Sequence, residues 1–239
     1  MLRCAFYILI LYSFALISYK ETNPAPQMIE PVVPNPMAPQ KYSYLALGDS
    51  YTIGESVPEA DRWGVHLAGL LRTSGVAVSN PTTIARTGWT TSELSQAIAA
   101  KQITQTFDLV SLLIGVNNQY RGQSLESYRT ELAELIKTSV RFAKNEPGRV
   151  ILLSIPDWGQ TPFAQGQDAQ RITQEINAFN AVAQEEAKKA SVTFIDINPL
   201  SKKAATDRSY VASDGLHYSG KMHLEWAQLA LPVGEKILK

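Results

Sequence analysis

The stretch L-A-L-G-D-S-Y-T-I-G, residues 45–54, decides how the fold of this chain is interpreted. Its apolar first half is typical of a buried strand, which Gly48, Asp49 and Ser50 then end abruptly. Each of these three residues favours a turn, so a purely structural interpretation is available. The alternative is that the turn presents Ser50 as a nucleophile. Residues elsewhere in the chain decide between the structural and the catalytic interpretation.

The pattern of a short apolar run followed by an amphipathic helix recurs from Lys41 onward, which predicts an α/β fold with a parallel sheet covered on both faces. The five expected strands are 42–47, 76–79, 108–114, 150–155 and 192–197. The expected helices are 63–72, 91–102, 125–144, 169–190 and 221–238. Thr90 and Glu93 have capping-box spacing, and Pro232 is expected to kink or interrupt the last helix.

Composition limits the possible functions. The 239 residues are 45% hydrophobic and 18% charged, which is typical of a globular chain with one full-sized core. Basic and acidic residues number 22 each, so the formal net charge is zero and no basic field attracts nucleic acid. The only cysteine, Cys4, lies near the N-terminus, so the folded part has no thiol for a disulfide or a metal site.

The first 40 residues are interpreted as a targeting segment and a tether. Arg3 precedes an apolar run over 4–17, which is the pattern of an export signal and is shorter than the roughly 20 residues that span a bilayer. We therefore expect a signal peptide in 1–20, with an uncleaved N-terminal anchor as the alternative. Residues 21–40 contain six prolines and are expected to form an extended linker. The predicted location is periplasmic, secreted or membrane-tethered outside the cytoplasm, and any membrane contact is expected only through an uncleaved N-terminal segment.

Polar residues follow several of the expected strands, where parallel sheets bind their ligands. Ser50 follows the first strand, Gly88 the second and Asn117 the third, while Asp214 and His217 come after the fifth. Because the carboxyl ends of parallel strands share one edge of the sheet, we expect these residues to meet there.

The chemistry of these residues is complementary. A serine needs an imidazole to take its proton, and the imidazole needs a partner that fixes its tautomer. Asp214 and His217 are three residues apart, a spacing that brings side chains together within a helical turn. The Ser50 and Gly88 amides and the Asn117 side chain are candidate donors to the oxyanion that forms when an ester is attacked.

In these motifs the chain resembles the SGNH/GDSL hydrolases, over nearly all of residues 41–239. The blocks that carry the resemblance, in order, are G-D-S-Y at 48–51, Gly88, G-V-N-N at 115–118 and D-G-L-H at 214–217. The resemblance implies a flavodoxin-like three-layer α/β/α fold with a five-stranded parallel sheet in one domain, residues 41–239. It also implies a triad of Ser50, His217 and Asp214, an oxyanion hole from Ser50, Gly88 and Asn117, and no metal or other cofactor.

Two positions depart from the family pattern, because Asn118 replaces an aspartate and Tyr218 replaces a proline that often follows the histidine. Both departures affect the expected loop details more than the chemistry. Asp157 and Asp196 also follow strands, but neither has a histidine at a comparable spacing.

Other motifs receive structural interpretations. His66 and His223 lie in helical patterns and are expected to pack, and Arg121 is interpreted as a solvated loop residue. The stretch 215–221 partly matches a phosphate-binding loop but lacks its final Ser or Thr, so nucleotide binding is not expected.

We therefore expect an exported serine esterase that forms an acyl-enzyme. Aromatic residues near the strand ends are expected to line an acyl or sugar pocket: Tyr51, Trp89, Tyr120, Trp158 and Tyr218. No long apolar flap is evident, which favours small-molecule short-chain esters or carbohydrate O-acyl esters over triglycerides. The alternatives are a catalytically inactive surface-binding relative, or an acyltransferase that uses the same triad.

Overall fold

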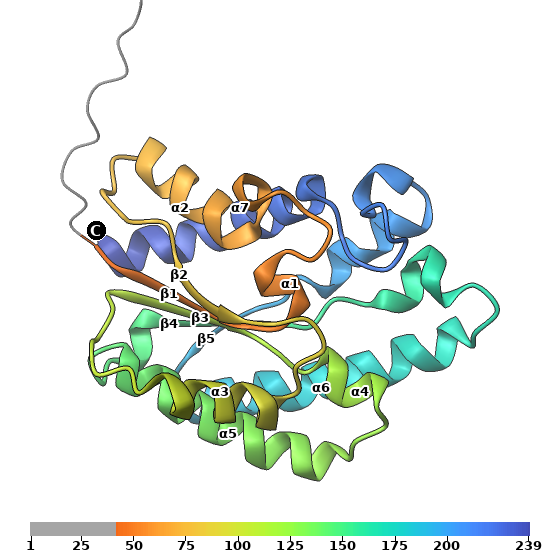
Figure 1. Cartoon of the computed structure of the whole chain (residues 1–239), viewed down its shortest axis with the longest axis horizontal. Helices are drawn as coiled ribbons and strands as arrows, with labels where there is room; N and C mark the ends of the chain where they lie inside the picture. Colours follow the sequence, from red (N-terminus) through yellow and green to blue (C-terminus); the bar gives the residue numbers. More distant parts are fainter. Residues whose placement is uncertain (1–41) are drawn as a thin grey trace, which may run out of the picture. The chain divides into compact units, whose positions relative to one another are not determined.

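The computed structural model describes residues 42–239, so the predicted signal or anchor segment in 1–20 and the predicted linker in 21–40 lie outside the described residues. Its five parallel strands form one sheet in the order β2-β1-β3-β4-β5 (Figure 1). The strands are β1 Tyr44–Gly48, β2 Thr82–Ala85, β3 Leu109–Leu113, β4 Val150–Leu153 and β5 Thr193–Ile195. The order reverses between β1 and β3, so the crevice beyond their carboxyl ends is the expected ligand site.

Helices cover both faces of the sheet, with α2 and α7 on one side and α3, α5 and α6 on the other (Figure 1). The α-helices are α1 Ser50–Ile53, α2 Trp63–Thr73, α3 Thr91–Lys101, α4 Val116–Tyr120, α5 Leu125–Phe142, α6 Ala169–Lys189 and α7 Gly220–Leu238. The 3-10 helices are η1 Glu59–Asp61, η2 Pro147–Arg149, η3 Trp158–Gln160, η4 Pro162–Ala164, η5 Asn198–Ala205 and η6 Arg208–Tyr210. The predicted flavodoxin-like α/β/α fold is confirmed.

The second strand was predicted at the wrong place. Residues 76–79 make only one isolated bridge, between Val78 and Tyr42, and the strand itself is Thr82–Ala85. This strand lies at the edge of the sheet beside β1, and only Ile84 of its four residues is buried. An edge strand does not need a continuous apolar run, so the apolar segment before Pro81 gave the stronger but misleading signal.

Two predictions at helix ends have different outcomes. The capping box is present, because the Thr90 hydroxyl accepts from the Glu93 N–H while the Glu93 carboxylate accepts from the Thr90 N–H at 2.8 Å. Pro232 does not interrupt α7, which runs unbroken to Leu238. Pro232 is exposed, so the carbonyl that loses its helical partner has access to water.

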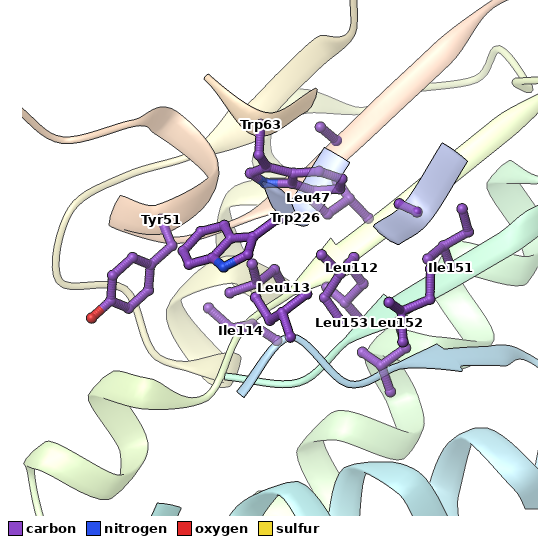
Figure 2. Close-up of a cluster of buried hydrophobic side chains, with 14 of the residues drawn as sticks. Leu47, Tyr51, Trp63, Leu112, Leu113, Ile114, Ile151, Leu152, Leu153 and Trp226 are labelled. Carbon is purple, nitrogen blue, oxygen red and sulfur yellow. The ribbon is translucent and has the colours of Figure 1, made fainter. Parts of the chain in front are cut away.

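The core beneath the nucleophile turn is aromatic. Figure 2 shows Tyr51 beside Trp226, with Trp63 and residues of β3 close by, and the rings of Tyr51 and Trp226 meet edge to face at 6.0 Å. His223 lies in the same core, where its Nδ1 accepts the N–H of Trp63 at 3.2 Å. Burial lowers the pKa of His223 to about 3, so this imidazole is neutral and structural.

None of the helices in residues 42–239 combines the length and the apolar character that crossing a bilayer requires.

Candidate active site

Ser50 is presented by a very tight turn between β1 and α1. Asp49 caps α1, because its Oδ1 accepts the N–H of Tyr51 at 3.0 Å. Gly48 is required, since a Cβ there would overlap the Thr52 side chain and the carbonyl of Leu113. The turn therefore fixes Ser50 at the carboxyl edge of the sheet, as the sequence predicts.

The capping carboxylate of Asp49 is fully buried, and its Oδ2 has no hydrogen-bond partner. Burial raises the pKa of Asp49 to about 7 although the Tyr51 N–H opposes the shift. Asp49 thus supports the turn from below and does not face the cavity that Ser50 lines.

Asp214 and His217 form a short polar contact at this edge. Nδ1 of His217 lies 2.6 Å from Oδ2 of Asp214, while Oδ1 of Asp214 accepts the N–H groups of Leu216 and His217 at 2.9 Å each. Ser56 also donates its hydroxyl to Oδ2 of Asp214 at 2.8 Å. Burial raises the pKa of Asp214, but the hydrogen bonds from His217, Leu216 and Ser56 outweigh it and lower the pKa to about 2. The carboxylate is therefore ionised, and its negative charge lies beside the imidazole of His217.

A cavity of about 150 Å³ brings the distant motifs together. Ser50, Asn117 and His217 all line it, although they come from three widely separated parts of the chain. A nucleophile, a base and an amide donor around one cavity can perform acyl transfer from an ester.

Two of the three donors expected for an oxyanion, the Ser50 N–H and the Asn117 side chain, belong to residues that line the cavity. Within residues 42–239, no protein acceptor takes the N–H of Ser50 or of Gly88. Gly88 has a φ of +86° and does not line the cavity directly. It precedes Trp89, whose carbonyl accepts Nδ2 of Asn117 at 2.9 Å, so the two predicted donors lie on segments in direct contact.

A set of hydrogen bonds from α4 and the turn after it holds the Gly88 segment. Arg121 donates to the Gly88 carbonyl at 2.5 Å and pairs with Glu93 at 3.1 Å. Arg121 is exposed in a turn, as the sequence suggested, but its guanidinium is also held by these two partners. Asn118 accepts the N–H of Thr91 at 3.1 Å and donates to the Thr91 hydroxyl at 2.6 Å. Both the oxygen and the nitrogen of the Asn118 side-chain amide, which replaces the family's aspartate, are thus hydrogen-bonded.

The loop after α1 approaches the same segment from the other side. The Thr87 hydroxyl donates to the Glu55 carboxylate, next in the chain to Ser56. Ser56 itself has a φ of +60°, which is uncommon for a residue with a side chain. This loop therefore touches both the Gly88 segment and Asp214.

The aromatic residues expected in the pocket divide into two groups. Tyr51, Tyr120 and Trp158 line the cavity. Trp89 and Tyr218 do not, and Tyr218 is fully buried with its hydroxyl donated to the Asp157 carbonyl at 2.7 Å. Tyr218 therefore belongs to the core and not to the lining of the cavity.

Three lining residues were missed from the sequence: Val116, Phe163 and Leu216. Val116 and Leu216 adjoin the predicted site residues Asn117 and His217, so their positions in the motifs could have predicted that they line the cavity. Phe163 lies in η4, in a loop with no periodic pattern, and its N–H donates to the Gly215 carbonyl at 2.9 Å. This contact joins the loop after β4 to the histidine loop.

The rival acids have structural roles. Asp157 is buried and accepts hydrogen bonds from Gly159, Gln160 and Thr173. Asp196 is exposed and accepts the N–H of Asn198, and neither acid lines the cavity. Among residues 42–239, no group of three or more His, Cys, Asp or Glu is placed to hold a metal ion.

Comparisons with known proteins identify a family and a shared fold. The family model described as "GDSL-like Lipase/Acylhydrolase family" matches residues 46–224. A search of curated proteins finds no match.

Among solved structures, a lipase/acylhydrolase from Enterococcus faecalis is similar at 21% identity and a TM-score of 0.62, covering 83% of this chain and 97% of that chain. The acetylxylan esterase Axe2 from Geobacillus stearothermophilus is similar at 19% identity and a TM-score of 0.63, covering 85% and 99%. The psychrotrophic esterase EstA from Pseudoalteromonas sp. is similar at 15% identity and a TM-score of 0.59, covering 82% and 93%. At these identities the structural likeness shows the shared fold.

Proposed function

The chain belongs to the GDSL-like lipase/acylhydrolase family and is an ester-hydrolysing serine hydrolase, and we propose that Ser50 is its nucleophile, His217 its general base and Asp214 the residue that orients the base. The observation that carries this assignment is the 2.6 Å contact between Asp214 and His217 at the wall of a cavity that Ser50 also lines. Asp214 is ionised, so it holds the proton of His217 on Nδ1 and leaves the other ring nitrogen free to accept one.

The reaction proceeds in two halves. The Ser50 oxygen attacks the ester carbonyl carbon while His217 accepts the hydroxyl proton. The resulting oxyanion is stabilised by the N–H groups of Ser50 and Gly88 and by Nδ2 of Asn117. The alcohol leaves as His217 returns the proton to it, and an acyl group remains on Ser50. Water, deprotonated by His217, then attacks the acyl carbon, and the carboxylic acid is released as His217 returns the proton to the Ser50 oxygen.

The substrate is proposed to be an ester of a short acyl group, on a small alcohol or a carbohydrate. A cavity of about 150 Å³ is smaller than the roughly 300–1,000 Å³ of sites for drug-sized ligands, which favours acetyl or similar groups over long chains. The structural likeness to an acetylxylan esterase supports this size of acyl group. Efficient hydrolysis of emulsified long-chain lipid alone would contradict it.

Export is proposed from the sequence of the first 20 residues, with Arg3 before the apolar run over 4–17. Immunodetection of the full chain in fractions of producing cells tests this proposal. Recovery in the cytoplasmic fraction alone would contradict it.

The Ser50→Ala variant tests the nucleophile. With 4-nitrophenyl acetate we expect kcat to fall by about 10⁴ to 10⁶, while the urea unfolding curve stays close to that of the wild type. A fluorophosphonate probe should label the wild type and not the variant. Ser127→Ala, on the exposed surface of α5, is the matched control and should keep full activity. Undiminished turnover by Ser50→Ala, or no labelling of the folded wild type, would contradict the assignment; the second result would favour a surface-binding protein without turnover.

A further inference from the structure

A second hollow, of about 280 Å³, adjoins the active-site cavity and shares Tyr120 and Trp158 with it. Its other walls are mainly polar and include Gln119, Gln167 and Arg171. This hollow is larger than the cavity that holds Ser50. The two spaces therefore meet at a pair of aromatic rings, with the small space on the catalytic side.

The floor of this hollow is rigid. Trp158 is only 4% exposed, and its indole N–H donates to the Gln119 side chain at 2.8 Å. The other end of the Gln119 amide donates to Glu175 at 2.7 Å, so both ends of the amide are fixed. A surface that is already ordered loses little conformational entropy when a ligand binds.

An exposed aromatic ring stands between the two spaces. Tyr120 is 57% exposed, and its ring meets Trp158 edge to face at 5.5 Å. Phe163 supports it at 6.4 Å and is itself 40% exposed. Tyr120 follows Asn117 by three residues in α4, a spacing that places the ring beside the proposed oxyanion donor.

Polar groups with spare hydrogen-bonding capacity surround this ring. Arg171 has a side chain that is 70% exposed, and its ion pair with Glu175 is long, at 3.6 Å. The amide nitrogen of Gln167 donates to the Phe163 carbonyl at 3.2 Å, which leaves its oxygen free to accept. A sugar ring has an apolar face of C–H groups and an edge of hydroxyls, so it matches an exposed aromatic ring flanked by amides and a guanidinium.

We propose that this hollow, between Tyr120 and Arg171, binds the carbohydrate that forms the alcohol part of the ester, while the smaller cavity receives the acyl group. The inference rests on the proposed function, because only acyl transfer at Ser50 gives the two spaces these roles. It assigns the substrate as an O-acylated oligosaccharide, with the sugar next to the scissile ester lying on Tyr120.

Two substrates and three variants test the inference. For each enzyme, kcat/KM is measured with an O-acetylated oligosaccharide and with 4-nitrophenyl acetate, and the ratio of the two values is compared. In Arg171→Gln and in Tyr120→Leu we expect this ratio to fall about three- to tenfold, the effect of one or two lost contacts to neutral hydroxyls. Arg141→Gln, an exposed arginine near the end of α5, is the control and should leave the ratio unchanged.

A binding measurement separates this inference from the proposed function. Titration calorimetry of Ser50→Ala with the deacetylated oligosaccharide should show binding that is weakened by Arg171→Gln in the same background. Unchanged ratios in both Arg171→Gln and Tyr120→Leu would overturn the inference while leaving the nucleophile assignment intact. Loss of binding to phospholipid vesicles in Tyr120→Leu, with an unchanged ratio, would also overturn it by assigning the exposed rings to a lipid surface.

Discussion

Replacing Ser56 with glycine changes two opposing contributions of one residue to stability. Its hydroxyl donates to Oδ2 of Asp214 at 2.8 Å, the same oxygen that contacts His217. Its backbone has a φ of +60°, which glycine adopts far more readily than serine. Glycine therefore removes the hydrogen bond to Asp214 and relieves the backbone strain at the same time.

Ser191 provides a matched control for the strain alone. It has a φ of +58°, is exposed at the end of α6, and makes no side-chain hydrogen bond among the described residues. Relief of the left-handed conformation is worth about 1–2 kcal/mol, and the greater freedom of glycine in the unfolded chain costs about 0.4–1 kcal/mol. Ser191→Gly should therefore stabilise the fold by about 0.5–1 kcal/mol.

Ser56→Gly has the same strain relief but also loses a hydrogen bond to a carboxylate. That bond is worth about 1–1.5 kcal/mol, which is below the usual range for bonds to charged groups because the position is exposed. We therefore expect no net stabilisation in Ser56→Gly, and a free energy of unfolding lower than that of Ser191→Gly by about 1–1.5 kcal/mol. Urea unfolding of both variants at one pH measures this difference.

Activity should separate the two variants more clearly. If the hydroxyl positions Asp214, Ser56→Gly lowers kcat about tenfold with KM within twofold of wild type, since about 1.4 kcal/mol corresponds to a factor of ten. Ser191→Gly should keep wild-type kcat. Ser56→Asn should recover part of the loss, because asparagine tolerates this backbone conformation and its amide can donate. Wild-type kcat in Ser56→Gly, or an equal loss in Ser191→Gly, would refute the reasoning.

The remaining predictions concern three groups, Asp49, Arg121 and His223. Burial raises the pKa of Asp49 to about 7, so between about pH 4 and 7 the folded chain holds a proton that the unfolded chain has lost. The contribution of Asp49 to stability should therefore fall as pH rises through this window, so in chemical unfolding at pH 4.5 and 8 the free energy of unfolding of the wild type minus that of Asp49→Asn should be smaller at pH 8. Arg121→Gln loses the donor to the Gly88 carbonyl, and we expect kcat to fall about tenfold with little change in KM; an altered melting temperature with wild-type kcat would argue against this. His223→Leu leaves the Trp63 N–H without its acceptor and should lower the free energy of unfolding by about 1–3 kcal/mol in urea titrations. In the wild type the folded state resists protonation of His223, because burial lowers its pKa to about 3, so the contribution of His223 to stability should fall as pH drops from about 6.5, opposite in sign to that of Asp49; a difference in free energy of unfolding between wild type and His223→Leu that is the same at pH 5 and pH 8 would contradict this.

The fold was predictable wherever burial on both faces forces a continuous apolar strand. The fully buried residues of β1, β3 and β4 gave this signal, and so did the apolar run around β5. The edge strand β2 has the sequence T-T-I-A and gives no such signal, because it needs apolar residues only where it faces the core. Its position follows from its pairing with β1, which is a tertiary property.

The residues that we propose to react could be expected to meet because their relations are local or are set by strand ends. Asp214 and His217 meet through a spacing of three residues, and Ser50 follows directly from the end of β1. Ser56 and Phe163 had no such signal. Ser56 lies 158 residues from its partner Asp214, and Phe163 enters the cavity because its loop bonds to the histidine loop. Such contacts depend on how the loops pack against one another, and the residue pattern within each loop does not predict this packing.

The amide at position 118 shows how a departure from the family pattern is accommodated without altering the site. Nδ2 of Asn118 donates to the Thr91 hydroxyl and to the Gln123 side chain, at 2.6 and 2.7 Å. The Thr91 hydroxyl in turn donates to Glu131 on α5. A carboxylate at position 118 can only accept, so it would compete with Glu131 for this single hydroxyl proton and place two like charges beside it. Asparagine and Glu131 are therefore compatible as a pair, and the N–H of Thr91 keeps its acceptor. The Gly88 segment is consequently held by an amide where the family uses a carboxylate, which explains why the motif can change at this position while Asn117 keeps its place at the cavity.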